Sequence, residues 1–307
     1  MHGTHEIPVD HGVRDLRTPQ PRRHLPPHGR LPDPGPSADE QYLGVIHEGS
    51  VPAGDEGRIL LFVEETTLDG GAVSGAVRIG STVRRSPSAG SEYVRALLAL
   101  FEERGWPGAP RFLGVDARGR EMLGYLEGRA AVTPEQRAVA RADETLVRVA
   151  RLVREFHDLT HGTPLAGDQD VVCHNDLAPK NTVYAVDGTG WRPSAFVDWD
   201  LAAPGERVHD VAHVCWQYLD LGPGVTDVAE AARRMRLVHD AYGLTGGAGL
   251  VEAVLWWQDR CWRGIQAGAD RGEPALVGLR ERGAVAEVRA AYEWVDRHRR
   301  ELGALLR

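Results

Sequence analysis

The sequence contains little lysine and little cysteine. Only one of its 36 basic residues, Lys180, is a lysine. Three cysteines are an odd number and are widely separated, and they show none of the short spacings that form zinc sites or disulfide frameworks: Cys173, Cys215 and Cys261. We therefore expect buried thiols.

Long apolar runs are also missing. The longest, ILLFV at 59–63 and ALLALF at 96–101, fall short of the roughly 20 residues that cross a bilayer. The N-terminus lacks the apolar centre of a signal peptide. The formal net charge of −8 argues against nucleic acid, whose phosphates require a concentrated basic face. The sequence predicts a cytoplasmic protein with neither a membrane nor nucleic acid as its partner.

The N-terminal part of the chain changes texture near residue 58. The residues before it are rich in Pro, Gly and His without periodicity, which is typical of a disordered leader over 1–57. Beyond it, AVSGAVRIG and STVRRS predict strands, 91–104 predicts a helix, and RFLGV and EMLGYLE flank a turn as a hairpin. These elements predict a small α+β lobe over 58–128.

Residues 129–307 predict a larger, mainly α-helical lobe. The segment TPEQ at 133–136 combines a Thr cap, a Pro and a Gln, which predicts the start of a long helix ending near His161 and Gly162. The chain after about residue 205 has a helical pattern, interrupted by turn signals at 222–224 and 243–249.

The stretch CHNDLAPKN at 173–181 contains residue types suited to catalysis. It is followed by two strand-like runs, TVYAV at 182–186 and AFVDW at 195–199, with the turn-forming DGTGWRPS between them. A hairpin centred near residues 189–190 would set Asn181 opposite Asp198. Asp176 would lie in the loop that enters this hairpin.

These three side chains suit phosphoryl transfer. Carboxylate and amide oxygens from Asn181 and Asp198 are the ligands that Mg²⁺ takes together with nucleotide phosphates. Asp176 would then be free to accept a hydrogen bond from a hydroxyl group and orient it. This division of roles matches a reaction that depends on positioning and charge neutralisation.

The pattern His174-x-Asp176-x-x-x-x-Asn181, followed by FVDWD at 196–200, resembles the aminoglycoside phosphotransferase and choline kinase-like family. The resemblance implies a bilobal protein-kinase-like α+β fold. It also implies ATP or GTP as co-substrate, Mg²⁺ as cofactor and a hydroxylated small molecule as acceptor. The likeness covers roughly residues 60–300 in lobe order, but its specific residues lie within 174–200.

The resemblance also assigns roles to single residues. Asp176 resembles the catalytic aspartate, and Asn181 and Asp198 resemble the metal ligands. His174 would brace the loop and Asp210 would tie it to the following helix. Asp200 has an acidic counterpart in many family members. Lys180 either contacts a phosphate or the acceptor, or points to solvent.

The N-terminal lobe departs from the family pattern. The family places a phosphate-binding lysine on the third strand and a glutamate partner on the next helix, whereas no lysine precedes residue 180 here. Arg84 or Arg85 could replace it, with a change of geometry but not of charge. We favour Arg84 because it continues the strand alternation with Thr82, and Glu92 is the nearest candidate partner.

Three further features remain open between two interpretations. The DGGAVSG segment with Gly70 and Gly71 could cover nucleotide phosphates or form a plain hairpin turn. The segment at 124–127, with Tyr125, could be an interlobe hinge whose backbone reads the base, or a simple linker. Five tryptophans could line an acceptor pocket, but we expect most of them in the core: Trp216, Trp256, Trp257, Trp262 and Trp294.

Three functions compete. The first is a small-molecule kinase that acts on an aminoglycoside, another antibiotic, or a metabolite such as an amino alcohol or sugar amine. The second is a kinase-like ligand-binding protein with little or no turnover, suggested by the missing lysine. The third is a haloacid dehalogenase-type phosphatase using Asp198 and Asp200, but the parallel-sheet pattern and downstream lysine of that fold are missing after residue 200.

Overall fold

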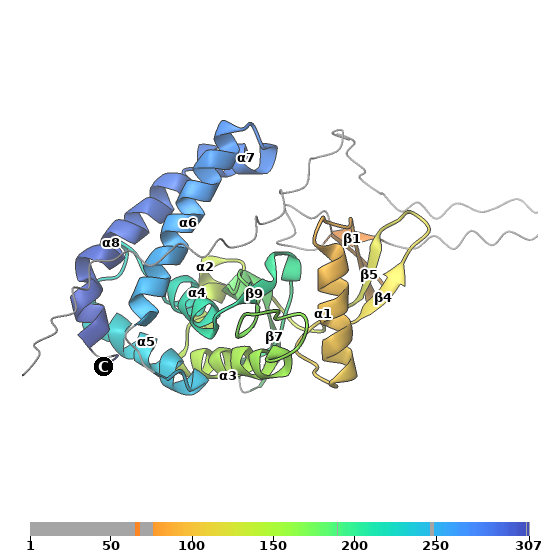
Figure 1. Cartoon of the computed structure of the whole chain (residues 1–307), viewed down its shortest axis with the longest axis horizontal. Helices are drawn as coiled ribbons and strands as arrows, with labels where there is room; N and C mark the ends of the chain where they lie inside the picture. The colour runs from red at the N-terminus through yellow and green to blue at the C-terminus, as the bar shows by residue number, and fades with distance from the viewer. Residues whose placement is uncertain (1–64, 68–75, 189, 246–248, 305, 307) are drawn as a thin grey trace, which may run out of the picture. The chain divides into compact units, whose positions relative to one another are not determined.

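An antiparallel sheet begins the described part of the chain, which comprises residues 65–67, 76–188, 190–245, 249–304 and 306 of a computed structural model (Figure 1). Within these residues the strand order is β1-β2-β3-β5-β4. The strands are β1 (Thr66–Thr67), β2 (Val77–Ile79), β3 (Thr82–Arg85), β4 (Phe112–Val115) and β5 (Glu121–Gly124). The predicted hairpin at 111–127 is therefore present as β4 and β5.

One face of this sheet carries both apolar and charged side chains. Val83 pairs with Arg78 on one side and with Leu123 on the other, and Arg85 pairs with Glu121. Opposed residues of antiparallel strands share a face, as do residues two apart on one strand. Leu123 is part of the main core and Val83 packs against it. Arg78 and Arg85 therefore project from the same face as these core residues.

Helix α1 (Ser91–Glu103) confirms the helix predicted over 91–104. Its buried apolar residues have the predicted spacing: Val94, Leu97, Leu98 and Phe101. The Phe101 ring lies 5.2 Å from the ring of Trp199 and 6.4 Å from that of Phe156. Helix α1 thus shares an aromatic cluster with the segment that carries the predicted metal ligand Asp198.

The single long helix predicted from residue 133 is wrong, because two helices are present. The capping box of Thr133 and Gln136 starts α2 (Pro134–Ala140), and α3 (Asp143–Thr160) begins after a break. At the break, Arg234 donates to the Arg141 carbonyl and also contacts Asp143. Contacts with a later helix thus stabilise an interruption that the apolar pattern did not reveal. The predicted end near residues 161–162 is confirmed.

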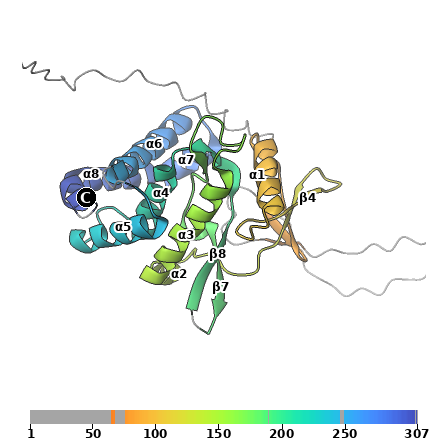
Figure 2. The same cartoon turned by 60° about the horizontal axis from the view of Figure 1, so that its bottom comes forward.

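The catalytic-type motif lies among short strands after α3. Strand β6 (Val171–Cys173) pairs with β9 (Ala203–Gly205), and β7 (Thr182–Asp187) pairs with β8 (Gly190–Phe196) as the predicted hairpin (Figure 2). Two 3₁₀ turns flank that hairpin, η1 (Pro179–Asn181) and η2 (Trp199–Leu201).

The remainder of the chain is helical, as predicted. The helices are α4 (Arg207–Leu219), α5 (Val228–Tyr242), α6 (Leu250–Asp270), α7 (Pro274–Glu281) and α8 (Ala284–Ala304). An N-terminal antiparallel sheet followed by a mainly helical part confirms the predicted α+β class. In the described residues, no helix combines the length and apolarity needed to cross a membrane.

The described residues all belong to one compact unit of the chain. The leader predicted over 1–57 lies outside them. The predicted division of the folded part at residue 128 stays a prediction.

Candidate active site

The loop after β6 is held by a buried carboxylate. Asp210, near the start of α4, accepts hydrogen bonds from the backbone N–H groups of His174 (2.7 Å) and Asn175 (2.9 Å). Asn175 has a left-handed backbone, with φ of 65°, a conformation that Asn tolerates better than most residues. Its side-chain amide also donates to the Leu201 carbonyl at 2.9 Å. These bonds fix the backbone that enters the position of Asp176.

Asp176 and Asn181 are in direct contact. The Asn181 amide nitrogen donates to the Asp176 carbonyl at 2.8 Å and to its carboxylate at 2.7 Å. The amide oxygen of Asn181 then remains as its acceptor group. The exposed Lys180 places its ammonium 3.5 Å from the Asp176 carboxylate. The spacing of five residues therefore brings a carboxylate, an amide and an ammonium group together.

Asp198 lies at the end of the hairpin, but the predicted register is off by one residue. The Asn181 carbonyl accepts from the backbone N–H of Val197 at 2.9 Å, so Asn181 faces Val197 and not Asp198. Asp187 pairs with Gly190, so the hairpin is centred one residue before the predicted position, and the β-bulge between Val183 and Tyr184 offsets part of this difference. Asp198 follows in a left-handed conformation, with φ of 65°.

His174 connects the loop to this hairpin end. Its Nε2 lies 3.1 Å from the Val197 carbonyl, and its Nδ1 accepts from the backbone N–H of Asp176 at 3.3 Å. This pattern requires the tautomer with a proton on Nε2. The ring is fully buried and lies 4.4 Å from the Trp199 ring. His174 is thus placed to brace the positions of both Asp176 and Asp198.

The Asp198 carboxylate carries uncompensated negative charge. The side chain reaches solvent, but the protein crowds it enough that partial desolvation raises its pKa, and the nearby charges of Asp200 and Asp176 raise it further. In the described part of the chain, no hydrogen-bond donor contacts this carboxylate. A hard divalent cation would relieve the repulsion between these groups. This donor set fits Mg²⁺, and Asn181 and Asp198 are the residues that would hold it.

A buried polar network supports Asp210 from behind. His157 on α3 approaches it, with Nε2 3.1 Å from the carboxylate, and its Nδ1 lies 2.7 Å from the Tyr242 hydroxyl. Tyr242 in turn accepts from Arg207 at 3.1 Å. Burial lowers the pKa of His157, so it is neutral and donates to Asp210, whose pKa is lowered by His157 and by backbone donors.

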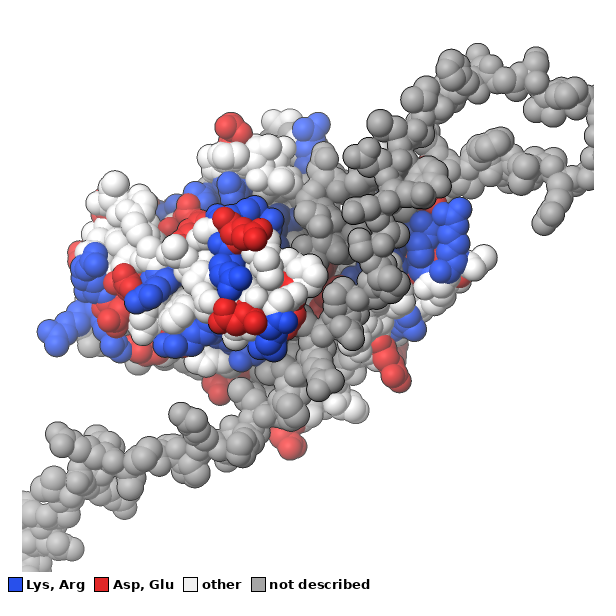
Figure 3. Space-filling model, turned by 90° about the horizontal axis from the view of Figure 1, so that it is seen from above, with Lys and Arg blue, Asp and Glu red and all other residues white. Residues whose placement is uncertain are grey.

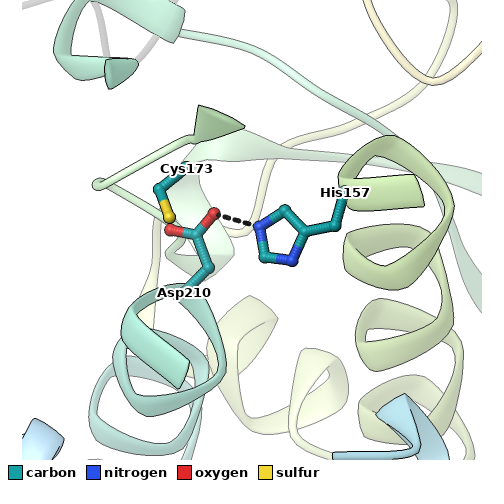
Figure 4. Close-up of side chains that lie close together, drawn as sticks. All are labelled: His157, Cys173 and Asp210. Carbon is teal, nitrogen blue, oxygen red and sulfur yellow. Dashed lines mark hydrogen bonds and ion pairs between the residues drawn. The ribbon is translucent and has the colours of Figure 1, made fainter. Parts of the chain in front are cut away.

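The group of His157, Cys173 and Asp210 has potential metal ligands within 4.8 Å of one another (Figure 4). Two observations favour a structural role for it. His157 and Asp210 already satisfy each other, and burial raises the pKa of the Cys173 thiol, which donates to the Glu206 carbonyl at 3.3 Å. His157 was not predicted as part of this network. The available sign in the sequence was a histidine directly after Phe156 in the apolar stripe of a helix.

Arg85, rather than the favoured Arg84, reaches the segment after β8. Its Nη1 lies 2.7 Å from the Asp200 carboxylate, and its Nε donates to Glu121 at 2.9 Å. Arg84 projects from the opposite face of the strand, where it bonds Thr82 at 2.6 Å and faces Asp116 at 3.6 Å. The alternation with Thr82 therefore identified the face of β3 that points away from Asp200.

The partner of Arg85 also differs from the expectation. Glu92 is exposed on α1, whereas Glu121 on β5 is only 1% exposed and accepts from Arg85 and from Arg95, the latter at 2.8 Å. A strand thus supplies the carboxylate that we expected from a helix. The signal available in the sequence was a lone acidic residue at the start of an apolar strand.

The chain that leaves β5 crosses to the catalytic hairpin. The backbone of Arg129 exchanges two hydrogen bonds with Tyr184, at 3.0 and 2.8 Å, and Ala131 donates to the Pro179 carbonyl at 3.2 Å. Gly128 has φ of +149°, and a Cβ there would lie 2.6 Å from the Tyr184 carbonyl oxygen. The sheet is thereby joined to the loop that holds Asn181. Gly70 and Gly71 lie outside the described residues.

The tryptophans of the helical part have mixed surroundings. Trp216 and Trp294 are buried, Trp257 and Trp262 are half-buried, and Trp256 is 39% exposed. On α6, burial raises the pKa of the Cys261 thiol to about 11, with a smaller contribution from the charge of Asp176. Trp216 and Trp294 belong to the main core and Trp257 packs against it, so we find core packing for three of the five, while Trp256 is available to solvent.

Comparisons with known proteins agree with this geometry. A model of the phosphotransferase enzyme family known as APH matches residues 75–250. The trifolitoxin immunity protein of Rhizobium leguminosarum bv. trifolii is 26% identical over 273 residues, which cover 79% of this chain and 99% of that protein.

Solved structures show the same fold. A choline/ethanolamine kinase family protein from Mesorhizobium loti matches with a TM-score of 0.51 and 17% identity, over 80% of this chain and 92% of that one. The GDP complex of aminoglycoside 2'-phosphotransferase-IIIa matches with a TM-score of 0.53 and 12% identity, over 78% and 95%. The resemblance seen in the sequence motif is confirmed, and the chain belongs to the APH phosphotransferase enzyme family.

Proposed function

We propose that this protein transfers the terminal phosphoryl group of ATP or GTP to a hydroxyl group of a small molecule. The observation that carries the proposal is the convergence of Asp176, Asn181 and Asp198, with direct contact between the first two and mutual repulsion among the carboxylates. Membership of a phosphotransferase family supports the reaction type.

In this mechanism each side chain has one task. Asp176 accepts a hydrogen bond from the acceptor hydroxyl, orients its oxygen towards the phosphoryl group and takes up its proton. Asn181 keeps the Asp176 carboxylate in place through its amide nitrogen. Bound Mg²⁺, held by Asn181 and Asp198, would neutralise the charge of the nucleotide phosphates. Lys180 lies near enough to Asp176 to contact a phosphate or the acceptor.

Arg85 is the proposed phosphate-binding cation of the sheet. Its Nη1 already contacts Asp200 beside the metal site, and its position on the core-facing side of β3 suits a contact with a nucleotide. Guanidinium groups bind phosphate in a bidentate manner, so this residue would contribute geometry as well as charge.

The acceptor is proposed only as a class. One solved relative is a GDP and kanamycin complex of APH(2'')-IIIa, and the curated relative is named as a toxin immunity protein. Among the described residues on the face seen in Figure 3, basic and acidic side chains are interspersed, whereas a polycation would favour an extended acidic area. We therefore propose a hydroxylated antibiotic or toxin as acceptor, with small metabolites as the competing class.

A second candidate is a kinase-like ligand-binding protein with little turnover. Two carboxylates, Glu121 and Asp200, already pair with Arg85 and compete with a phosphate for it. In this alternative the protein would confer immunity by holding a toxin. The intact trio of Asp176, Asn181 and Asp198 favours catalysis over it.

The two candidates are separated by product analysis. The purified protein is incubated with Mg²⁺, ATP or GTP, and a panel of hydroxylated antibiotics, peptides and amino alcohols. A catalyst produces an acceptor heavier by one phosphate in mass spectrometry, and the Asp176→Asn variant does not. Acceptor binding by calorimetry without any phosphorylated product, across the panel, would instead favour the binding protein.

A further inference from the structure

Arg78 lies on the face of the sheet that carries Arg85. It is directly opposite Val83, and Val83 is two residues from Arg85 on β3. Together these residues cover the side of the sheet from which Arg85 reaches Asp200. A nucleotide whose phosphates contact Arg85 would therefore extend its base along this face towards Arg78 and the end of β5.

Arg78 is held over the chain segment that follows β5. Its guanidinium carbon lies 3.5 Å from the centre of the Tyr125 ring, and its Nη2 lies 3.2 Å from Oε1 of Glu127. The side chains of Arg78 and Glu127 are 35% and 82% exposed, so a ligand can reach both. An aromatic ring, a cation and an anion thus share one accessible surface where the base would arrive.

Two backbone N–H groups of this segment already donate hydrogen bonds within the protein. The Tyr125 N–H donates to the Ser81 carbonyl at 2.9 Å, and the Gly124 N–H donates to the Arg111 carbonyl at 2.8 Å. Those two donors are not available to a base. Side chains must then supply part of the recognition, and within the described residues Nη1 of Arg78 and Oε2 of Glu127 retain free hydrogen-bonding capacity.

An arginine paired with a glutamate presents an N–H donor beside a carboxylate acceptor. Guanine presents the complementary order, with the O6 acceptor beside the N1–H and N2–H donors. Adenine presents only one donor at this edge, N6–H beside the N1 acceptor, so it leaves one carboxylate oxygen without a donor, whereas guanine can donate to both oxygens through N1–H and N2–H.

We propose that Arg78 and Glu127 read the base of the phosphoryl donor and select a guanosine nucleotide over an adenosine nucleotide. This inference rests on the proposed function, since it assumes that the nucleotide lies along this face of the sheet. It goes beyond that function by assigning specificity to an ion pair that takes no part in the chemistry.

Calorimetric titration of the full chain with GDP and with ADP, each with Mg²⁺, tests the inference without any acceptor. We expect GDP to bind about tenfold more tightly than ADP, and Glu127→Gln and Arg78→Met each to remove most of that ratio. The matched control is Glu293→Gln, which alters a similar exposed pair with Arg289 (3.1 Å) on α8 and should leave the ratio unchanged.

The outcomes separate this inference from the proposed function. Equal binding of both nucleotides, tighter ADP binding, or a ratio unaffected by Glu127→Gln overturns the base selection and leaves phosphoryl transfer standing. GDP selectivity that depends on Arg78 and Glu127, in a protein that phosphorylates no acceptor, supports the base selection and rejects the function. If neither nucleotide binds, the base selection is overturned.

Discussion

The hairpin of β7 and β8 and the N-terminal sheet differ in how their charged side chains are paired. Around the hairpin, Asp198 has no donor within the described residues and lies near the charges of Asp176 and Asp200. In the sheet, the cation Arg85 already contacts two carboxylates, Glu121 and Asp200. The hairpin thus has an excess of negative charge that awaits a cation, whereas the sheet holds a cation that is already paired.

This difference indicates how the two regions would respond to a nucleotide. Mg²⁺ and phosphate would add a cation to the region with excess negative charge and an anion to the region that is already neutral. Binding at the sheet then requires Arg85 to share its guanidinium with a phosphate, while binding at the hairpin relieves repulsion. The hairpin should therefore dominate catalysis, and the sheet should govern the affinity and choice of nucleotide.

The largest expected effect comes from Asp176→Asn. Loss of the carboxylate removes the group that orients the acceptor hydroxyl, and we expect transfer to fall by about 10²–10⁴-fold. The fold should be retained because Asn can still interact with Asn181. The measurement is the initial rate of product formation, with the exposed Asp168→Asn as the control. Full activity in the Asp176 variant would remove the distinction between the two regions.

Gly128→Ala tests the joint between the regions. A Cβ at this position would meet the Tyr184 carbonyl oxygen at 2.6 Å, in a backbone conformation that L-residues rarely adopt. We expect a loss of about 2–4 kcal/mol in the free energy of unfolding. Gly119→Ala is the matched control, because its φ is +78° but nothing lies within 4 Å of the added carbon. Equal losses in urea unfolding for both variants would show that the contact with β7 does not matter.

The comparison also shows what the sequence could reveal. Asp176 and Asn181 were found because five residues of one loop separate them, so local spacing alone places them together. Arg85 was named only as the alternative to Arg84, because the choice between neighbouring strand residues depends on which face of the strand meets the core. The packing of Val83 against the core identifies that face only in the folded sheet.

The remaining misses are long-range. His157 was not predicted, because it meets the predicted Asp210 only when α3 and α4 pack together. The break between α2 and α3 likewise depends on Arg234 of a later helix. Local patterns therefore predicted the elements and the reacting groups, while tertiary packing decided which charged side chains support them.

A smaller effect is expected from Arg85→Met. The variant loses a charge-assisted contact with the nucleotide phosphates, so its Kd should rise by about tenfold or more. Glu121 would remain paired with Arg95, which limits any loss of stability. Arg84→Met, on the opposite face, should change the Kd by less than about twofold. Calorimetry measures the nucleotide Kd of both variants. A larger increase for Arg84→Met than for Arg85→Met would show that the phosphates bind on the face of β3 that carries Arg84.

The smallest effect is a loss of stability in mild acid that originates in the helical part. His157 and His213 are buried there, and burial lowers the pKa of each below its usual value of 6.5. A histidine with a lowered pKa binds fewer protons in the folded state, so its contribution to the free energy of unfolding is complete above about pH 6.5 and is lost as the pH falls below it.

Residues 76–132, which include β2 to β5 and α1, contain no histidine. We expect the free energy of unfolding to fall by on the order of 1 kcal/mol between pH 6.5 and 5.5. In hydrogen exchange at decreasing pH, the amides of α3 and α4 should lose protection before those of the sheet. Earlier loss of protection in β3 and β5 would show that the acid-sensitive groups are not in the helical part.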